Sequence, residues 1–172
     1  TGTVLTSASS LAAGNLSGAL PAIDGSALTA LPPHPDLTQL VYSGWNSANN
    51  TQTGVRVAYP LDSDVVAVNT SYMTKSTGTF TCVKAGNYLI NVTTMNITTS
   101  YAHHRMLKNG SHVIQTHDYK NASNSWGGIS YCVAITLSVG HYISFDGINY
   151  AGSYNWHGGH SYSNLSIVYL NT

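Results

Sequence analysis

The chain has 172 residues, enough for one domain with a sizeable core and too few for two ordinary domains. Charged residues make up 7% of the chain and the formal net charge is zero, so the surface must be polar but nearly uncharged. There is no run of Lys or Arg to bind a phosphate backbone, and no apolar stretch approaches the roughly 20 residues that cross a bilayer. We therefore expect neither nucleic-acid binding nor membrane insertion.

The first 35 residues differ from the rest of the chain. Between Gly14 and Leu31, apolar residues are spaced irregularly among Gly and Pro, a pattern that breaks helices and leaves the leucines without a partner strand. Identical copies wrapped around a shared axis would bury these leucines, which predicts a fibre shaft, and a flexible linker is the alternative. We expect a shaft or linker at residues 1–35 and a head domain at residues 36–172. The first ten residues lack the features of a signal peptide. Because the sequence starts at Thr1 and not at Met, we also expect a longer parent protein.

From residue 37 onward, short β-branched and aromatic runs alternate with Gly, Asn and Ser clusters, and no period of 3.6 occurs. This pattern predicts an all-β sandwich or jelly roll. The ten expected strands are Leu37–Ser43, Val55–Tyr59, Val65–Asn69, Gly78–Val83, Tyr88–Met95, His103–Lys108, His112–Thr116, Gly128–Leu137, His141–Asn149 and Tyr162–Leu170.

Two stretches predict β-hairpins. In STGTFTCVKAGNYLI, residues 76–90, a strand, a tight Gly turn and a second strand follow one another. In LKNGSHV, Asn109 and Gly110 are the pair that favours a two-residue turn with positive φ at both positions.

Strict alternation in residues 128–137 predicts a half-buried strand. Its small, mildly polar face includes Cys132, whereas Cys82 shares the inward phase of Phe80 in its own strand, so we expect the two cysteines not to pair. The expected core face carries Ile129, Tyr131, Val133, Ile135 and Leu137.

The stretch YMTKSTGTFTCVKAGNYLI resembles the pattern of complement C1q-type globular heads: Tyr, a few polar residues, Thr-Gly-x-Phe-Thr, then Ala/Pro-Gly-x-Tyr. The similarity continues through MLKNGSHV, ISYCVAITLSVGHYISF and YSNLSIVYL, and covers roughly residues 37–170. The resemblance implies a ten-stranded jelly roll that assembles as a compact homotrimer, as in tumour necrosis factor-like proteins. The small face of residues 130–136 suits such an interface. His141 stands where the family usually has Asp, and Asn164 and Leu165 replace the Ser-Gly before its last strand. Too few Asp residues line up to carry over a calcium site.

Residues 14–31, GNLSGALPAIDGSALTAL, separately resemble segments of the tail fibres of tailed bacteriophages. The two resemblances agree, since a shaft that needs three chains would precede a head that forms trimers. They imply the receptor-binding tip of a viral tail fibre, carried on the virion outside the cell. A secreted C1q-like binding or signalling head and a purely structural trimerisation cap stay open. The sequence lacks the collagen-like Gly-x-y stalk expected before a complement head, which favours the viral interpretation.

Eight histidines raise the question of a metal site. His103 and His104 are adjacent, and neighbours in a strand point to opposite faces, so the two cannot share one ion without a bulge. His157 and His160 are weak candidates, since one imidazole per chain on a trimer axis would build a three-His site. We expect exposed or hydrogen-bonded imidazoles instead, and no cofactor.

Two side-chain pairs were weighed as catalytic groups. Asp118 follows His117, but no Ser lies in a strand-turn-helix elbow and no Gly-x-Ser-x-Gly motif occurs. Asp62 and Asp64 form a carboxylate pair of the kind a glycosidase needs, yet their sequence context is typical of a turn. We expect no enzyme activity.

Strand parity predicts where a receptor would bind. Successive connections of an antiparallel jelly roll alternate between its two ends, which places residues 43–54, 96–102, 117–128 and 150–160 together at the end away from the shaft. These segments carry all three tryptophans, and aromatic faces beside uncharged donors suit neutral sugar rings. The predicted partner is a host cell-surface polysaccharide or glycoprotein, and the predicted glycan-binding residues are Trp45, Tyr101, Tyr119, Trp126, Tyr154, Trp156 and His157.

Overall fold

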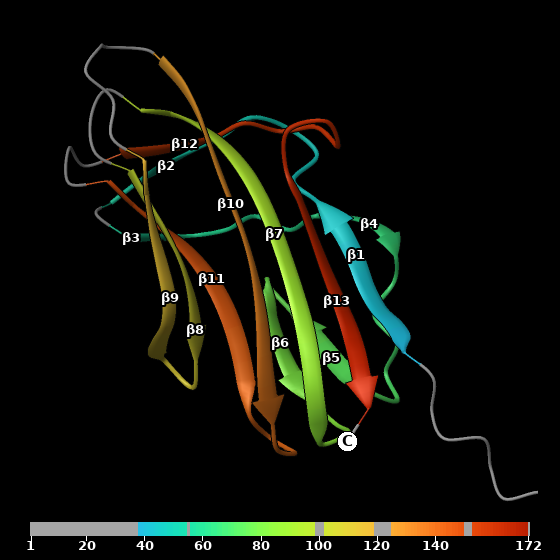
Figure 1. The fold of residues 1–172 in the computed structure, drawn as a ribbon. Coiled ribbons are helices and arrows are strands. Elements are labelled where there is room, and N and C mark those ends of the chain that lie inside the picture. Colours follow the sequence, from blue (N-terminus) through green and yellow to red (C-terminus); the bar gives the residue numbers. More distant parts are fainter. Residues whose placement is uncertain (1–37, 55, 99–101, 119–124, 150–152, 172) are drawn as a thin grey trace, which may run out of the picture. The chain divides into compact units, whose positions relative to one another are not determined.

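The computed structural model describes residues 38–54, 56–98, 102–118, 125–149 and 153–171. Every regular element among them is a β-strand (Figure 1), and they contain no helix that could span a membrane. The predictions for residues 1–35 lie outside the described residues. The strands are β1 (Gln39–Trp45), β2 (Asn50–Thr53), β3 (Arg56–Ala58), β4 (Ser63–Val66), β5 (Met73–Ser76), β6 (Thr79–Cys82), β7 (Gly86–Thr98), β8 (Ala102–Lys108), β9 (Ser111–Asp118), β10 (Ser125–Leu137), β11 (Tyr142–Asn149), β12 (Ser153–Trp156) and β13 (Asn164–Asn171).

The strands form two antiparallel sheets. In sheet A, β10, β7, β13, β1 and β4 lie side by side in that order, and β12 pairs with β7 beyond the end of β13 and carries β2 on its other edge (Figure 1). In sheet B the order is β5, β6, β11, β8 and β9, and β3 pairs with the same edge of β11 as β6. The all-β prediction is confirmed.

The stretch at residues 76–90 corrects one prediction. Its two predicted strands do not form a hairpin, because β6 belongs to sheet B and β7 to sheet A. The hairpin is instead β5–β6, whose turn residues Thr77 and Gly78 have φ values of 48° and 75°. The crossing lets Phe80 and Tyr88 approach the core from opposite sheets, and the Tyr88 hydroxyl donates a hydrogen bond to the Lys84 carbonyl in the connection.

The second hairpin prediction is confirmed. Asn109 and Gly110 have φ values of 51° and 79° and join β8 to β9, with Lys108 paired to Ser111. This geometry matches the right-handed twist of the two strands and requires residues that tolerate positive φ.

The described residues contain thirteen strands where ten were expected. The additional strands β2, β5 and β12 are four residues each and are rich in Asn, Ser and Thr, so their local propensity is weak. Hydrogen bonds from neighbouring strands hold them extended. The last strand begins at Asn164 and not at Tyr162, which leaves residues 157–163 as a loop between β12 and β13.

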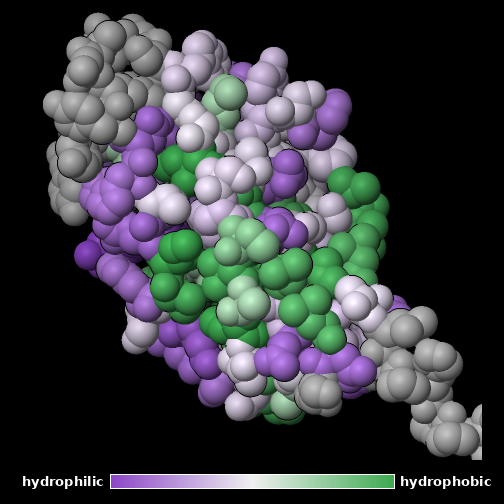
Figure 2. Space-filling model, in the orientation of Figure 1, coloured by the Kyte–Doolittle hydropathy of each residue, from purple (hydrophilic) through white to green (hydrophobic). Residues whose placement is uncertain are grey.

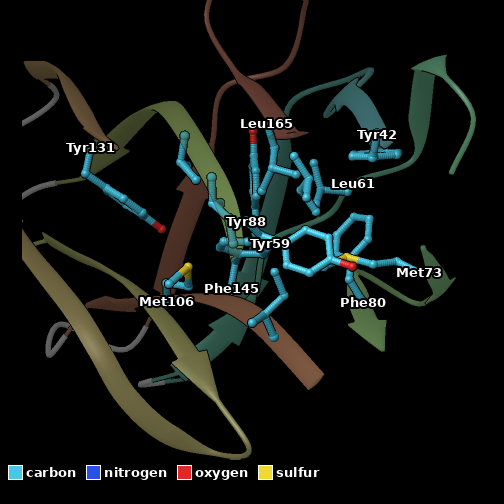
Figure 3. Close-up of a cluster of buried hydrophobic side chains, with 14 of the residues drawn as sticks. Tyr42, Tyr59, Leu61, Met73, Phe80, Tyr88, Met106, Tyr131, Phe145 and Leu165 are labelled. Carbon is cyan, nitrogen blue, oxygen red and sulfur yellow. The ribbon is translucent and has the colours of Figure 1, made fainter. Parts of the chain in front are cut away.

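The core lies between the two sheets and is unusually aromatic. Figure 3 shows side chains from both sheets meeting there, among them Tyr88 and Leu165 from sheet A and Phe80 and Phe145 from sheet B. The Tyr42 and Phe80 ring centroids are 4.7 Å apart and tilted, which is a favourable arrangement for aromatic pairs.

The predicted alternation in β10 is confirmed. Ile129, Tyr131 and Leu137 are buried, whereas the residues between them on the other face are exposed. Cys132 lies on that exposed face, and Cys82 is buried in β6 of the other sheet, as their phases predicted.

Candidate functional site

Strand registers gather the predicted binding segments at one end of the described domain. The last residues of β7 pair with the first residues of β10 and with Trp156 of β12, while Ala102 at the start of β8 pairs with the last residues of both β9 and β11. The start of β1 pairs near the end of β13, at the opposite end. We call the first of these ends the distal end; it is at the top of Figure 1.

Two of the predicted sugar-binding residues are in the core, so their assignment was wrong. Tyr154 and Trp156 belong to β12 and both are 0% exposed. Trp156 is paired with Asn96 of β7, whose side chain also faces inward, and its ring lies 4.8 Å from that of Tyr59. Pairing of β12 with its neighbouring strands turns Tyr154 and Trp156 toward the core. Both residues were predicted to lie in a loop, where no such orientation is imposed.

The other predicted residues fall into three groups. Tyr101 and Tyr119 lie outside the described residues. Trp45 is half-buried at the end of β1, with its ring 5.8 Å from the ring of His160. Trp126 and His157 remain on the surface and are brought together.

Three rings form an aromatic row at the distal end: Trp126, His157 and Tyr162. The His157 ring centroid lies 4.1 Å from the Trp126 ring and 4.2 Å from the Tyr162 ring, and it stacks nearly parallel on Tyr162. Trp126 is 52% exposed and Tyr162 is 43% exposed. The row therefore leaves two large aromatic rings partly exposed to solvent, each in contact with the imidazole of His157.

Hydrogen bonds between two loops hold the aromatic row in place. The Asn49 side-chain oxygen accepts from the Gly158 backbone N–H at 2.9 Å and also contacts Nδ1 of His157. Because that oxygen is an acceptor, Nδ1 must donate to it, which leaves Nε2 of a neutral His157 able to accept a hydrogen bond from a ligand. The Gly159 N–H donates to the Asn46 carbonyl at 2.7 Å, closing the contact between residues 46–49 and 157–163.

A Gly is required where the two loops touch. A Cβ at Gly158 would lie 2.2 Å from the backbone carbon of Ala48, so any larger residue would force the loops apart. Sequence reasoning missed Asn49, and it placed Tyr162 in a strand. The Gly158–Gly159 pair is the local signal that could have extended the loop to Tyr162.

The histidines weighed as metal ligands are separated by the fold. His103 and His104 point to opposite faces of β8, as expected: His104 faces inward, where Nδ1 shares a hydrogen bond with the Tyr131 hydroxyl at 3.0 Å. Burial, with Arg105 adding to it, lowers the pKa of His104 to about 3, so this imidazole is neutral at physiological pH. Among the described residues, no three His, Cys, Asp or Glu side chains are grouped where they could hold a metal ion.

The carboxylates weighed for catalysis make structural contacts. Asp62 accepts hydrogen bonds from the backbone N–H of Ser47 at 2.6 Å and from its hydroxyl at 3.0 Å. Asp64 forms an ion pair with Lys75 and accepts from the Tyr42 hydroxyl at 2.8 Å. Each carboxylate of this pair thus holds a different neighbouring segment in place.

A second surface feature lies on the outer face of sheet A. Ala134, Leu89, Val168 and Leu40 are directly paired across β10, β7, β13 and β1, and we call this row the apolar strip. Figure 2 shows hydrophobic surface gathered over this part of the sheet. Leu40, at the end of the strip, is 45% exposed.

Solved structures of tumour necrosis factor-family proteins share this fold. Eiger TNF from S. frugiperda is 12% identical, with a TM-score of 0.63 over 80% of this chain and 94% of the Eiger chain. Murine APRIL at pH 5.0 is 11% identical, with a TM-score of 0.61 over 77% of this chain and 100% of the APRIL chain. No protein-family model matches the chain, and no curated protein matches it.

Identities this low establish the fold alone. The chain has a jelly roll of the tumour necrosis factor type, so the predicted fold class is confirmed. Its function must be argued from its own surface.

Proposed function

We propose that this chain is the receptor-binding tip of a phage tail fibre, which forms a homotrimer and recognises a host cell-surface glycan through the aromatic row. The observation that carries the proposal is the exposure of the Trp126 and Tyr162 rings on either side of His157 at the distal end. Aromatic faces bind the apolar faces of sugar rings, while the Nε2 atom of His157 and neighbouring polar groups accept or donate hydrogen bonds to hydroxyls.

Low charge supports a neutral ligand. Only 7% of the residues are charged, and the residues that form the aromatic row and its support carry no carboxylate. A neutral polysaccharide suits this surface better than a phosphate-rich or strongly acidic target. The resemblance of residues 14–31 to tail-fibre segments supports placing the head on a virion.

The apolar strip supports the homotrimer. Its four residues form a continuous apolar row on a sheet face that also carries small polar side chains such as Ser130 and Thr136. Identical copies packed through this face would bury the strip, whereas leaving it exposed costs roughly 25 cal/mol for each Å² of apolar surface.

The experiment is alanine substitution of Trp126 and of Tyr162, with Tyr142→Ala as the matched control. Tyr142 is 38% exposed and begins β11, at the end away from the distal loops. Binding to host cells and to a panel of neutral polysaccharides is measured for variants that remain trimeric by light scattering. We expect each row variant to bind roughly tenfold more weakly, about 1.4 kcal/mol, and the control to bind as the wild type does.

Two outcomes would contradict the proposal. Unchanged attachment by both row variants would place the receptor site elsewhere or favour a purely structural trimerisation cap. Loss of the trimer on Trp126→Ala would assign the row to the subunit interface, because Trp126 lies on the same face of β10 as the apolar strip.

A further inference from the structure

Two imidazoles face each other across the β8–β9 hairpin. His103 and His117 are directly opposite in the antiparallel ladder, and residues so paired project from the same face of a sheet. Nε2 of His103 lies 3.2 Å from Nδ1 of His117, and the ring centroids are 4.2 Å apart at an angle of 63°. The pair lies on the outer face of sheet B, because His104 next to it faces the core.

This separation matches two ligands on one metal ion. With Zn–N bonds of about 2.0–2.1 Å and a tetrahedral angle, two ligating nitrogens are about 3.3 Å apart. We propose that His103 and His117 form a binding site for a divalent transition-metal ion such as Zn²⁺ or Ni²⁺. The described residues bring no third His, Cys, Asp or Glu to the pair, so they supply two ligands to the ion.

The surroundings suit a ligating His103. Its Nδ1 atom lies 2.9 Å from the side-chain amide of Gln115. If Nε2 of His103 binds the metal, the ring proton must be on Nδ1. The side-chain amide of Gln115 can accept a hydrogen bond from that N–H when it is flipped by 180°, so that its oxygen faces Nδ1. When both rings are neutral, one proton lies in the hydrogen bond between Nε2 of His103 and Nδ1 of His117. Metal binding moves this proton to the other nitrogen of the same ring, so no net proton is released.

The two ligands are held differently. His103 is 5% exposed and is fixed by pairing of β8 with strands on both sides, whereas His117 is exposed on β9, the last strand of sheet B. Arg105 lies on the same face of β8, but its guanidinium is paired with the Asp146 carboxylate, which compensates its charge.

The site would reinforce an edge. Strand β9 ends the order of sheet B, and His117 lies one residue before its last residue, at the distal end. An ion bridging the two strands would restrain the end of β9 in the way a short cross-link does. The proposal is independent of glycan binding, since none of its residues belongs to the aromatic row.

The test is isothermal titration of the untagged chain with ZnCl₂ and with NiCl₂ at pH 7.5. We expect one ion per chain with a dissociation constant in the micromolar range, and a rise in Tm of roughly 5 °C at a hundredfold excess over that constant. His117→Gln keeps a hydrogen-bonding partner for His103 but removes a strong ligand, and it should abolish both effects. His112→Gln is the matched control, because His112 lies on the same strand and contacts Arg105 instead.

Three results would overturn the proposal. They are no binding by the wild type below millimolar metal, equal binding by His117→Gln, or equal loss of binding in both variants. A second measurement needs no variant: in the NMR spectrum, substoichiometric Ni²⁺ should broaden the ring protons of His103 and His117 first. Broadening that begins at His157 or His160 would place the ion elsewhere.

Discussion

Alanine substitution of Trp156 and of Trp126, one at a time, should lower the free energy of unfolding by very different amounts. Trp156 is 0% exposed and its ring centroid lies 4.3 Å from Tyr154, 4.8 Å from Tyr59 and 5.5 Å from His104. Removing an indole from such a site leaves a cavity and typically costs 3–5 kcal/mol. Trp126 is 52% exposed, so its truncation should cost less than about 1 kcal/mol.

The packing around Trp156 sets this magnitude. A Cβ on Gly147 would lie 2.8 Å from the Trp156 ring, so the backbone of β11 already approaches the indole closely. We expect the surrounding structure to collapse little into the vacated space, so the free energy of unfolding of Trp156→Ala should fall by about 4 kcal/mol. This corresponds to a fall in Tm on the order of 10 °C for a domain of this size.

The assay is urea denaturation followed by far-UV circular dichroism at one fixed protein concentration, because the stability of the proposed trimer would depend on concentration. Trp156→Phe should recover more than half of the loss, because the ring remains and the indole nitrogen has no hydrogen-bond partner among the described residues. If Trp156→Ala were within 1 kcal/mol of the wild type, or Trp126→Ala cost as much, the placement of the two rings would be refuted.

Two further predictions concern ionic groups. Asp146→Asn leaves the guanidinium of Arg105, whose side chain is 1% exposed, without its carboxylate, so the free energy of unfolding should fall by about 3 kcal/mol in urea titrations, and a loss below 1 kcal/mol would argue against the buried pair. Burial acts to raise the pKa of Asp64, but hydrogen bonds from Lys75 and Tyr42 outweigh it and hold the pKa below its ordinary value of 3.8. Because the folded pKa is the lower one, the Asp64 contribution is present above about pH 4 and is lost as the pH falls further, so Asp64→Asn should flatten the stability profile there; identical profiles for variant and wild type would contradict this.

Local patterns were enough to predict several features of this protein. The alternation in β10 indicated which residues face the core, because the two-residue period of a strand is a property of the backbone itself. The turn at Asn109 and Gly110 followed from the φ values that those two residues tolerate. Composition alone indicated a polar, nearly uncharged surface.

Placement between the sheets needed the tertiary structure. The strand signals on either side of residues 82–86 are the same whether β6 and β7 form a hairpin or belong to different sheets. The need to bury Phe80 against the opposite sheet decides between the two arrangements. The same holds for β12, since a short polar segment becomes a strand only when β7 and β2 supply its hydrogen bonds.

The candidate sites show the same division. The clustering of the tryptophan-bearing segments at one end followed from strand parity, which counts connections and needs no register. The burial of Trp156 depends on its register with β7, and the pairing of His103 with His117 depends on the bulged register of the β8–β9 hairpin. The stacking of Tyr162 on His157 depends on the conformation of the loop at residues 157–163. A shift of one residue in these ladders would turn Trp156, His103 or His117 to the other face of its sheet.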